Sequence, residues 1–305
     1  MIVKRRNNTL LSIPKKNMTI YLLRSIREPI LHVSKDPIGL FSLIFSVFII
    51  TIAIAPSLIS PCDPYKINMY ETFQPPSFTH IFGTDDLGRD ILSQVIYGAR
   101  TSIFIATASI AFSLMLGTVL GLLAGYYGGR IDLAISMIID AKLSIPTFFL
   151  ILVVIAIFGG SIINMIIVIG ITIWPPIARV TRAAVYSIKA SDFVEAARAL
   201  GASSLWVISK HILPQIIGVI ISMGILQMGS AIIIEAGLSF LGFGDPTLIS
   251  WGRMLSIAQT YIDRAWWMGF FPGLFLFLTI LSFNIIGDKL YEYYNPRLRE
   301  KSIYL

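Results

Sequence analysis

The chain is poor in charge and in cysteine. Only 13% of its 305 residues are Asp, Glu, Lys or Arg, whereas 55% are hydrophobic. This composition excludes an ordinary water-soluble domain. The single cysteine, Cys62, cannot form a disulfide within the chain, so no covalent cross-link stabilises the fold. We therefore expect an integral membrane protein.

Catalytic motifs are also missing. No glycine-rich loop ends in Gly-Lys-Ser or Gly-Lys-Thr, so we do not expect this chain to bind the phosphates of ATP. Neither His-Glu-x-x-His nor Gly-x-Ser-x-Gly is present, which argues against a membrane-embedded hydrolase. The stretch from His80 to Asp90 offers one histidine among carboxylates, which is weak evidence for a soft-metal site. We expect no enzymatic activity, no cofactor bound by this chain and no metal.

The sequence does contain long apolar segments. A helix needs roughly 20 apolar residues to cross the hydrocarbon core of a bilayer. Six windows qualify, although the third is short unless it begins within the amphipathic stretch from Ile131. They are Pro37 to Ile59, Ser102 to Leu123, Leu143 to Phe158, Ile162 to Ala178, Gln215 to Gly237 and Met268 to Ile286. The predicted fold class is all-α, with about six transmembrane helices.

The basic residues predict the orientation of these spans. With six spans both termini lie on one side, and cations favour the cytoplasmic side. Cytoplasmic termini put most of the 24 basic residues inside and leave only Lys66, Arg89, Arg100, Arg253 and Arg264 outside. The net charge of +7 then reflects contact with lipid headgroups, and we expect no nucleic-acid partner.

These expectations divide the chain into four parts. The parts are a cytoplasmic tail (1–36), the first span with an outer loop (37–97), a helical core (98–290) that contains the loop 192–214, and a cytoplasmic tail (291–305). Within the first part, the segment from Met18 to Glu28 can form a helix that lies on the inner leaflet.

A polar island separates spans four and five, from Asp192 to Pro214. Asp192 can cap a short helix, with Glu195 in the capping-box position. Gly201 suits the left-handed residue that ends a helix. Ser203 or Ser204 can start a second short helix. Pro214 favours the opening turn of span five and predicts a break in the helix there. The island is therefore either a rigid knob with a function or a plain helical hairpin.

Three features inside the spans need an interpretation. Gly117, Gly121 and Gly125 have four-residue spacing, which favours close helix packing over a sliding seam. Glu235 either lines the outer part of a translocation path, where it meets a cationic group or holds a gate, or lies at the membrane edge and bonds a helix end. The pair Trp266-Trp267 is typical of an aromatic belt at the interface.

The polar island resembles a motif of a known family. Glu195-Ala196-Ala197, then Gly201, then Leu213-Pro214, before the second-last span, resembles the EAA loop of prokaryotic ABC import permeases. Further stretches resemble the C-type permease of dipeptide, oligopeptide and nickel importers. They are His80 to Asp90, Leu238 to Pro246, Ser250 to Gly252, Asn284 to Asp288 and Asn295 to Arg297.

The resemblance implies a type I importer permease in a prokaryotic cytoplasmic membrane. It implies four kinds of partner: a homologous second permease, one or two ATPase subunits that bind ATP and Mg, an extracytoplasmic substrate-binding protein, and the bilayer. It implies that the loop couples to the ATPase through Asp192, Glu195, Ala196, Ala197, Gly201, Leu213 and Pro214. The expected solute is a di- or oligopeptide; nickel, oligosaccharides and, in a different class, a passive channel remain alternatives.

Overall fold

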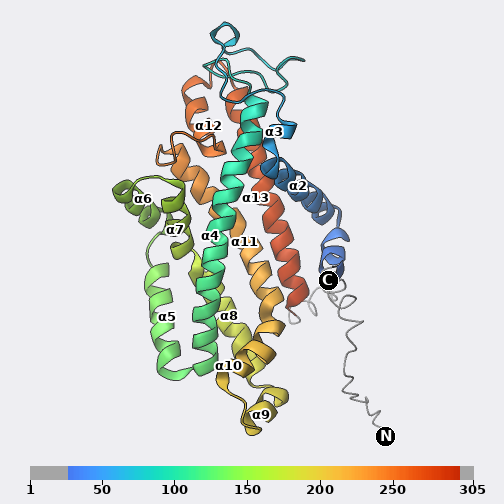
Figure 1. Ribbon diagram of the computed structural model, residues 1–305, viewed down its shortest axis with the longest axis vertical. Helices are drawn as coiled ribbons and strands as arrows, with labels where there is room; N and C mark the ends of the chain where they lie inside the picture. Colours follow the sequence, from blue (N-terminus) through green and yellow to red (C-terminus); the bar gives the residue numbers. More distant parts are fainter. Residues whose placement is uncertain (1–26, 296–305) are drawn as a thin grey trace.

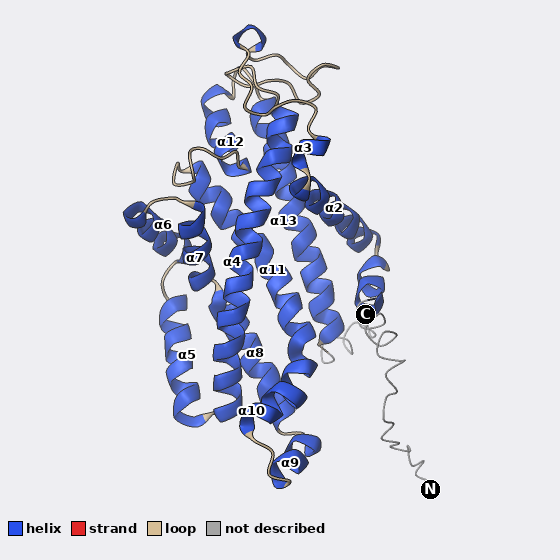
Figure 2. Ribbon diagram, in the orientation of Figure 1, coloured by secondary structure: helices blue, strands red, loops and turns tan. Residues whose placement is uncertain are grey.

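The protein is a bundle of long helices that stand side by side (Figures 1 and 2). The computed structural model describes residues 27–295, so nearly all of the helix expected at 18–28 and most of the tail 291–305 lie outside it. In chain order the elements are α2 (Pro37–Ile54), α3 (Pro56–Ile59), η2 (Met69–Glu71), α4 (Ile91–Tyr127), α5 (Gly129–Leu143), α6 (Thr147–Phe158), α7 (Ile162–Thr172), α8 (Trp174–Lys189), α9 (Asp192–Ala199), α10 (Ser204–Val207), η3 (Ile208–Ile212), α11 (Leu213–Phe240), α12 (Trp251–Ala258), η4 (Gln259–Tyr261) and α13 (Trp267–Tyr294).

Within residues 27–295, five helices are long and apolar enough to cross a membrane, and six spans result if one bent pair is counted as a span. The bent pair corrects the third predicted window, because α5 and α6 meet at an angle of 81° and do not form one straight helix. Pro146 explains the break: it lacks an N–H and disfavours helical geometry at Ile145 before it. The second span is longer than predicted, since α4 begins at Ile91. It runs unbroken across the boundary that we expected between residues 97 and 98.

The two ends of the bundle differ (Figure 1). At the lower end in the figure, α9 and α10 project between α8 and α11; we call this the α9 end. At the opposite end, the segment 60–90 and α12 form a compact cap; we call this the α12 end. The first span, α2, begins where Asp36 accepts a hydrogen bond from the Gly39 backbone N–H (3.1 Å) and pairs with Lys289 Nζ (3.1 Å), which joins α2 to α13.

Helix α4 lies at the centre of the bundle, and its glycines set how closely α8 approaches. A Cβ at Gly121 would stand 2.6 Å from Thr181 Cβ and 2.7 Å from the Ala178 carbonyl oxygen. Gly117 and Gly125 face Ile177 and Val185 of α8 in the same way. The backbones of α4 and α8 are therefore in direct contact along this face, which is the geometry that small residues permit between membrane helices.

We expect Gly121→Ala to lower stability and Gly273→Ala to leave it unchanged or raise it. The new methyl at position 121 has no room, and overpacking of this kind costs about 1–3 kcal/mol. Gly273 is also helical, but the nearest atom to its added Cβ is Leu255 Cδ2 at 3.6 Å, so only the helix-propensity gain of about 1 kcal/mol applies. The thermal unfolding midpoint in detergent measures both; equal midpoints for the two variants would contradict the packing argument.

Candidate functional site

The α9–α10 tip, which we define as residues 191–212, projects from the bundle. Helix α9 has Ser191 as its N-cap residue, so the predicted cap at Asp192 and its capping box are wrong. The helix begins one position earlier than predicted because Ser191, and not Asp192, has the extended backbone of a cap (φ −83°, ψ 146°). Asp192 and Glu195 still lie in the first turn of α9, where the helix dipole favours carboxylates.

Gly201 turns the chain between α9 and α10. Its φ is +86°, a backbone conformation that residues other than glycine rarely adopt. The Gly201 N–H donates to the Arg198 carbonyl (2.9 Å) and the Ala202 N–H donates to the Ala197 carbonyl (3.1 Å), which together form a Schellman motif. Ser203 then caps α10, its Oγ accepting from the Trp206 N–H (3.4 Å). The tip is thus a tightly hydrogen-bonded turn between two short helices.

Pro214 does not interrupt the helix that follows, contrary to the prediction. A continuous helical stretch runs from Ser204 to Phe240, with the π-helical segment η3 just before the proline. There the Leu213 N–H donates to the Ile208 carbonyl, one residue further back than in an α-helix. This wider turn accommodates Pro214, which has no N–H to donate.

The tip carries an apolar hollow of about 660 Å³ that opens to the surface. Leu200 at its rim is 89% exposed, although a leucine is usually buried. On one side, the Trp206 ring meets His211 edge-on with ring centroids 4.9 Å apart, and the Phe193 ring lies tilted to His211 with centroids 6.0 Å apart. The lining residues are Phe193, Ala196, Ala197, Leu200, Gly201, Ala202, Ser203, Trp206 and His211. Exposed apolar surfaces of this kind mark sites that bind another protein, a ligand or a membrane.

The base of the tip is fixed to the bundle. Val194 and Ala197 of α9 are buried in one apolar cluster with Tyr126 of α4 and Val185 of α8. The Arg198 guanidinium lies 4.8 Å from the centre of the Tyr126 ring, a cation–π distance. Val194 therefore anchors α9 to the ends of α4 and α8, Phe193 and Ala196 line the hollow, and Ala197 lies between the buried cluster and the hollow.

The cap at the α12 end is held by a buried polar network. Asp85 is 3% exposed; its Oδ1 accepts from the backbone N–H groups of Leu87 and Arg89, and its Oδ2 accepts from Arg89 Nε (2.7 Å) and Gln94 Nε2 (2.8 Å). The Trp267 indole N–H donates to the Thr84 carbonyl (3.1 Å). Trp267 is therefore buried against the cap and does not belong to an aromatic belt, because its N–H has a partner inside the protein.

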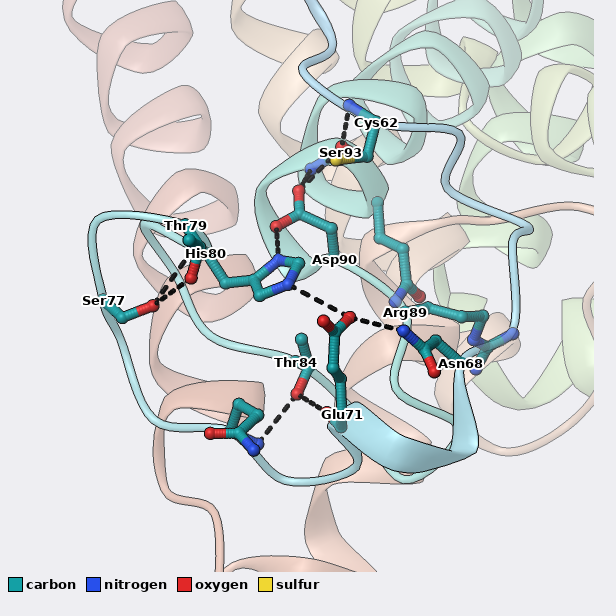
Figure 3. Close-up of polar contacts among 12 residues, drawn as sticks. Cys62, Asn68, Glu71, Ser77, Thr79, His80, Thr84, Arg89, Asp90 and Ser93 are labelled. Carbon is teal, nitrogen blue, oxygen red and sulfur yellow. Dashed lines mark hydrogen bonds and ion pairs between the residues drawn. The ribbon is translucent and has the colours of Figure 1, made fainter.

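Figure 3 shows the neighbouring polar contacts of the cap. His80 Nδ1 lies 2.9 Å from Asp90 Oδ1, and His80 Nε2 lies 3.5 Å from Glu71 Oε2. The other oxygen of Asp90 accepts from the backbone N–H and hydroxyl of Ser93 at the start of α4. Of the carboxylates between His80 and Asp90, Asp90 therefore bonds His80 and fastens the cap to α4, whereas Asp85 and Asp86 pair with Arg89.

Glu235 lies inside the protein. Its side chain is fully buried in α11, and Oε1 accepts a hydrogen bond from Ser239 Oγ (2.8 Å). Helix α12 covers it closely, since a Cβ at Gly252 would stand 2.2 Å from the Ala236 carbonyl oxygen. Burial in this position keeps the carboxyl of Glu235 away from solvent and from the hollow at the tip.

Comparison with known proteins decides the family. Residues 117–300 match the profile described as "Binding-protein-dependent transport system inner membrane component". The chain belongs to this family. It is 38% identical over 90% of its length to a dipeptide transport system permease of Alkalihalophilus pseudofirmus, which it covers to 90%. It is 34% identical over 94% of its length to an oligopeptide transport system permease of Bacillus subtilis, which it covers to 93%.

The fold of this inner membrane permease also matches solved structures. It superposes with a TM-score of 0.55 on a chain of the MetNI methionine ABC transporter in an inward-facing conformation, at 20% identity, covering 67% of the permease and 98% of that chain. A chain of an amino acid ABC transporter solved with histidines gives a TM-score of 0.51 and covers 66% of the permease. At this identity the likeness establishes the fold alone.

A second hollow of the permease, of about 380 Å³, lies between α11 and the bend that joins α5 to α6. Gln227 and Ser230 supply its polar groups from α11, and the Gln227 amide donates to the Ile173 carbonyl (3.4 Å). The lining residues are Lys142, Leu143, Thr147, Ile173, Pro176, Gln227, Ser230, Ile233 and Ile234. Sequence reasoning missed this hollow, although two polar residues spaced three apart within an apolar span were a visible signal.

Asp86 in the cap gives a pH-dependent prediction. Burial, reinforced by the neighbouring charge of Asp85, raises the pKa of the Asp86 carboxyl. A raised pKa means that the folded state favours the protonated acid. The contribution of Asp86 to stability is therefore fully present at low pH and is lost as the pH rises through the folded-state pKa. We expect Asp86→Asn to unfold at a higher temperature than the wild type at pH 7, with the difference shrinking towards pH 4. The exposed Asp263→Asn is the control; an identical response of both variants would refute the assignment to burial.

Proposed function

We propose that this permease carries di- or oligopeptides inward across the cytoplasmic membrane, driven by ATP hydrolysis on a partner subunit. The chain aligns over most of its length with permeases that are named for dipeptides, for di- and tripeptides and for oligopeptides. None of these three relatives is named for nickel or for an oligosaccharide, so peptides are the solute that the comparisons favour.

The observation that carries this proposal is the exposed apolar hollow at the α9–α10 tip. Burying such a surface against another protein is favourable, and its short helices keep it in one shape for docking. In the proposal an ATPase subunit docks there and binds ATP and Mg, while this chain binds no cofactor. The coupling residues are then Asp192, Glu195, Ala196, Ala197, Gly201, Leu213 and Pro214. A passive channel has no need of such a docking surface, which disfavours that alternative.

The docking proposal fixes the orientation of the chain. The α9 end faces the cytoplasm, where the ATPase is, and the cap at the α12 end faces outward. Basic residues support this orientation, because Arg179, Arg182, Lys189 and Arg198 all lie in α8 and α9. The cap is then the surface on which an extracytoplasmic substrate-binding protein delivers the peptide.

The translocation path in this proposal follows the hollow that contains Gln227 and Ser230. Its mouth lies on the surface of the chain, so a homologous second permease is the partner that closes it. In this proposal Glu235 belongs to the α11–α12 contact and not to the path, because its carboxyl is fully buried in this structure and bonds Ser239. The glycines at 117, 121 and 125 are packing residues in this proposal.

Ala196→Arg should abolish binding of the ATPase subunit, whereas Ala199→Arg should retain it. Both alanines are exposed on α9, but only Ala196 lines the hollow, where a charged side chain would remain buried and unpaired in the complex. Each variant is expressed with its second permease and ATPase, and the ATPase that co-purifies with the permease is measured.

The two arginine variants share one helix and one chemical change, so helix propensity and net charge are matched. Retention of the ATPase by both would contradict docking at the hollow. Loss of the ATPase from both, with the second permease still bound, would show that the contact is not confined to the hollow and includes the face of α9 that carries Ala199.

A further inference from the structure

Lys142 stands in the last turn of α5, next to the bend between α5 and α6. Its ammonium donates a hydrogen bond to Thr147 Oγ1 (2.9 Å) across the 81° break between α5 and α6. The side chain is partly buried and lines the hollow of about 380 Å³. A lysine within a membrane-spanning pair is costly, and such residues usually face a water-filled cavity or a solute path.

The carboxylates nearest to Lys142 along α5 already form ion pairs with arginines of α8. Asp140 pairs with Arg179, and Asp132 pairs with Arg182, so both link α5 to α8. None of the ion pairs among residues 27–295 includes Lys142. Its hydroxyl partner, Thr147, is neutral and uses one of the three ammonium donors. The cation therefore reaches the hollow without an acidic partner from the described part of the chain.

The rest of the hollow suits a polar chain with one anionic end. Gln227 and Ser230 present an amide and a hydroxyl on the facing side of α11, among Ile173, Ile233 and Ile234. These polar groups can bond a peptide backbone, which has both donors and acceptors. A volume of about 380 Å³ lies within the range of about 300–1,000 Å³ that is typical of small-molecule sites.

We propose that Lys142 is the group of the translocation path that contacts the terminal carboxylate of a peptide in transit. This inference rests on the proposed function. Every unmodified peptide has one terminal carboxylate whatever its side chains, so a single cation at this place serves a path that tolerates many sequences. The ammonium is a flexible point charge and not a rigid fork, so it holds the carboxylate without a fixed geometry. Weak contact also lets the peptide leave, which transport requires.

The test uses the complete transporter, with second permease, ATPase and binding protein, reconstituted in proteoliposomes. Uptake of a radiolabelled tripeptide with neutral side chains is compared for the wild type and for Lys142→Arg, Lys142→Met and Lys142→Glu. We expect the arginine variant to transport within about twofold of the wild type. The methionine variant should lose about tenfold or more, the size of a charge-assisted hydrogen bond, and the glutamate variant should lose more because it repels the carboxylate.

Ser144→Ala is the control for the bend. It removes the hydrogen bond from Ser144 Oγ to the Asp140 carbonyl (2.8 Å) at the end of α5 but leaves Lys142 and the lining of the hollow in place, so we expect transport within about twofold of the wild type. A loss as large as that of Lys142→Met would assign Lys142 to the shape of the bend and overturn the proposal. Wild-type transport by Lys142→Met would overturn it as well.

Two further outcomes are distinguishable. If Lys142→Met no longer co-purifies with the second permease, Lys142 pairs with that subunit and not with the solute, which contradicts the proposal. If the wild type itself takes up no peptide, the proposed function fails, and the inference fails with it. Retained ATPase stimulation by loaded binding protein in Lys142→Met, with reduced uptake, is the result that supports the proposal.

Discussion

The contact between α4 and α8 is the constraint on which the rest of the structure depends. Glycines on α4 remove the side chains that would separate the two helices, so α8 lies against the α4 backbone from Gly117 to Gly125. The same pair continues into the α9–α10 tip, where Tyr126 and Val185 bury one face of α9. Because interiors are close-packed and resist deformation, the tip and the bundle form one mechanical unit.

Helix α8 also joins the two hollows. Pro176 in its first turn lines the hollow of about 380 Å³, and its last turn leads into α9 through Ser191. At 1.5 Å per residue, its 16 residues span roughly 24 Å. Helix α11 makes a second connection, since it follows the tip directly and carries Gln227 and Ser230 further along. A displacement of the tip would therefore reach the polar hollow through two rigid helices.

The sequence predicted those features that depend on local pattern. Apolar length predicted an all-helical membrane fold, and the left-handed turn at Gly201 followed from its place after a short helix. The break predicted at Pro214 was wrong because the wider π-helical turn before it accommodates a residue that has no backbone N–H. Trp267 was misplaced because its partner is a carbonyl far away in sequence. Gln227 and Ser230 gave a local signal within span five, but tertiary structure alone places them and Lys142 around one hollow.

Uptake by the reconstituted complex tests the central claim most directly, which is that ATP hydrolysis on a partner drives a solute through this permease. Proteoliposomes are loaded with ATP and Mg, and labelled peptide is added outside with the binding protein. We expect accumulation above the external concentration that requires ATP inside, the ATPase subunit and the binding protein. Equilibration of peptide across the membrane without ATP or binding protein would contradict this claim and identify a passive channel.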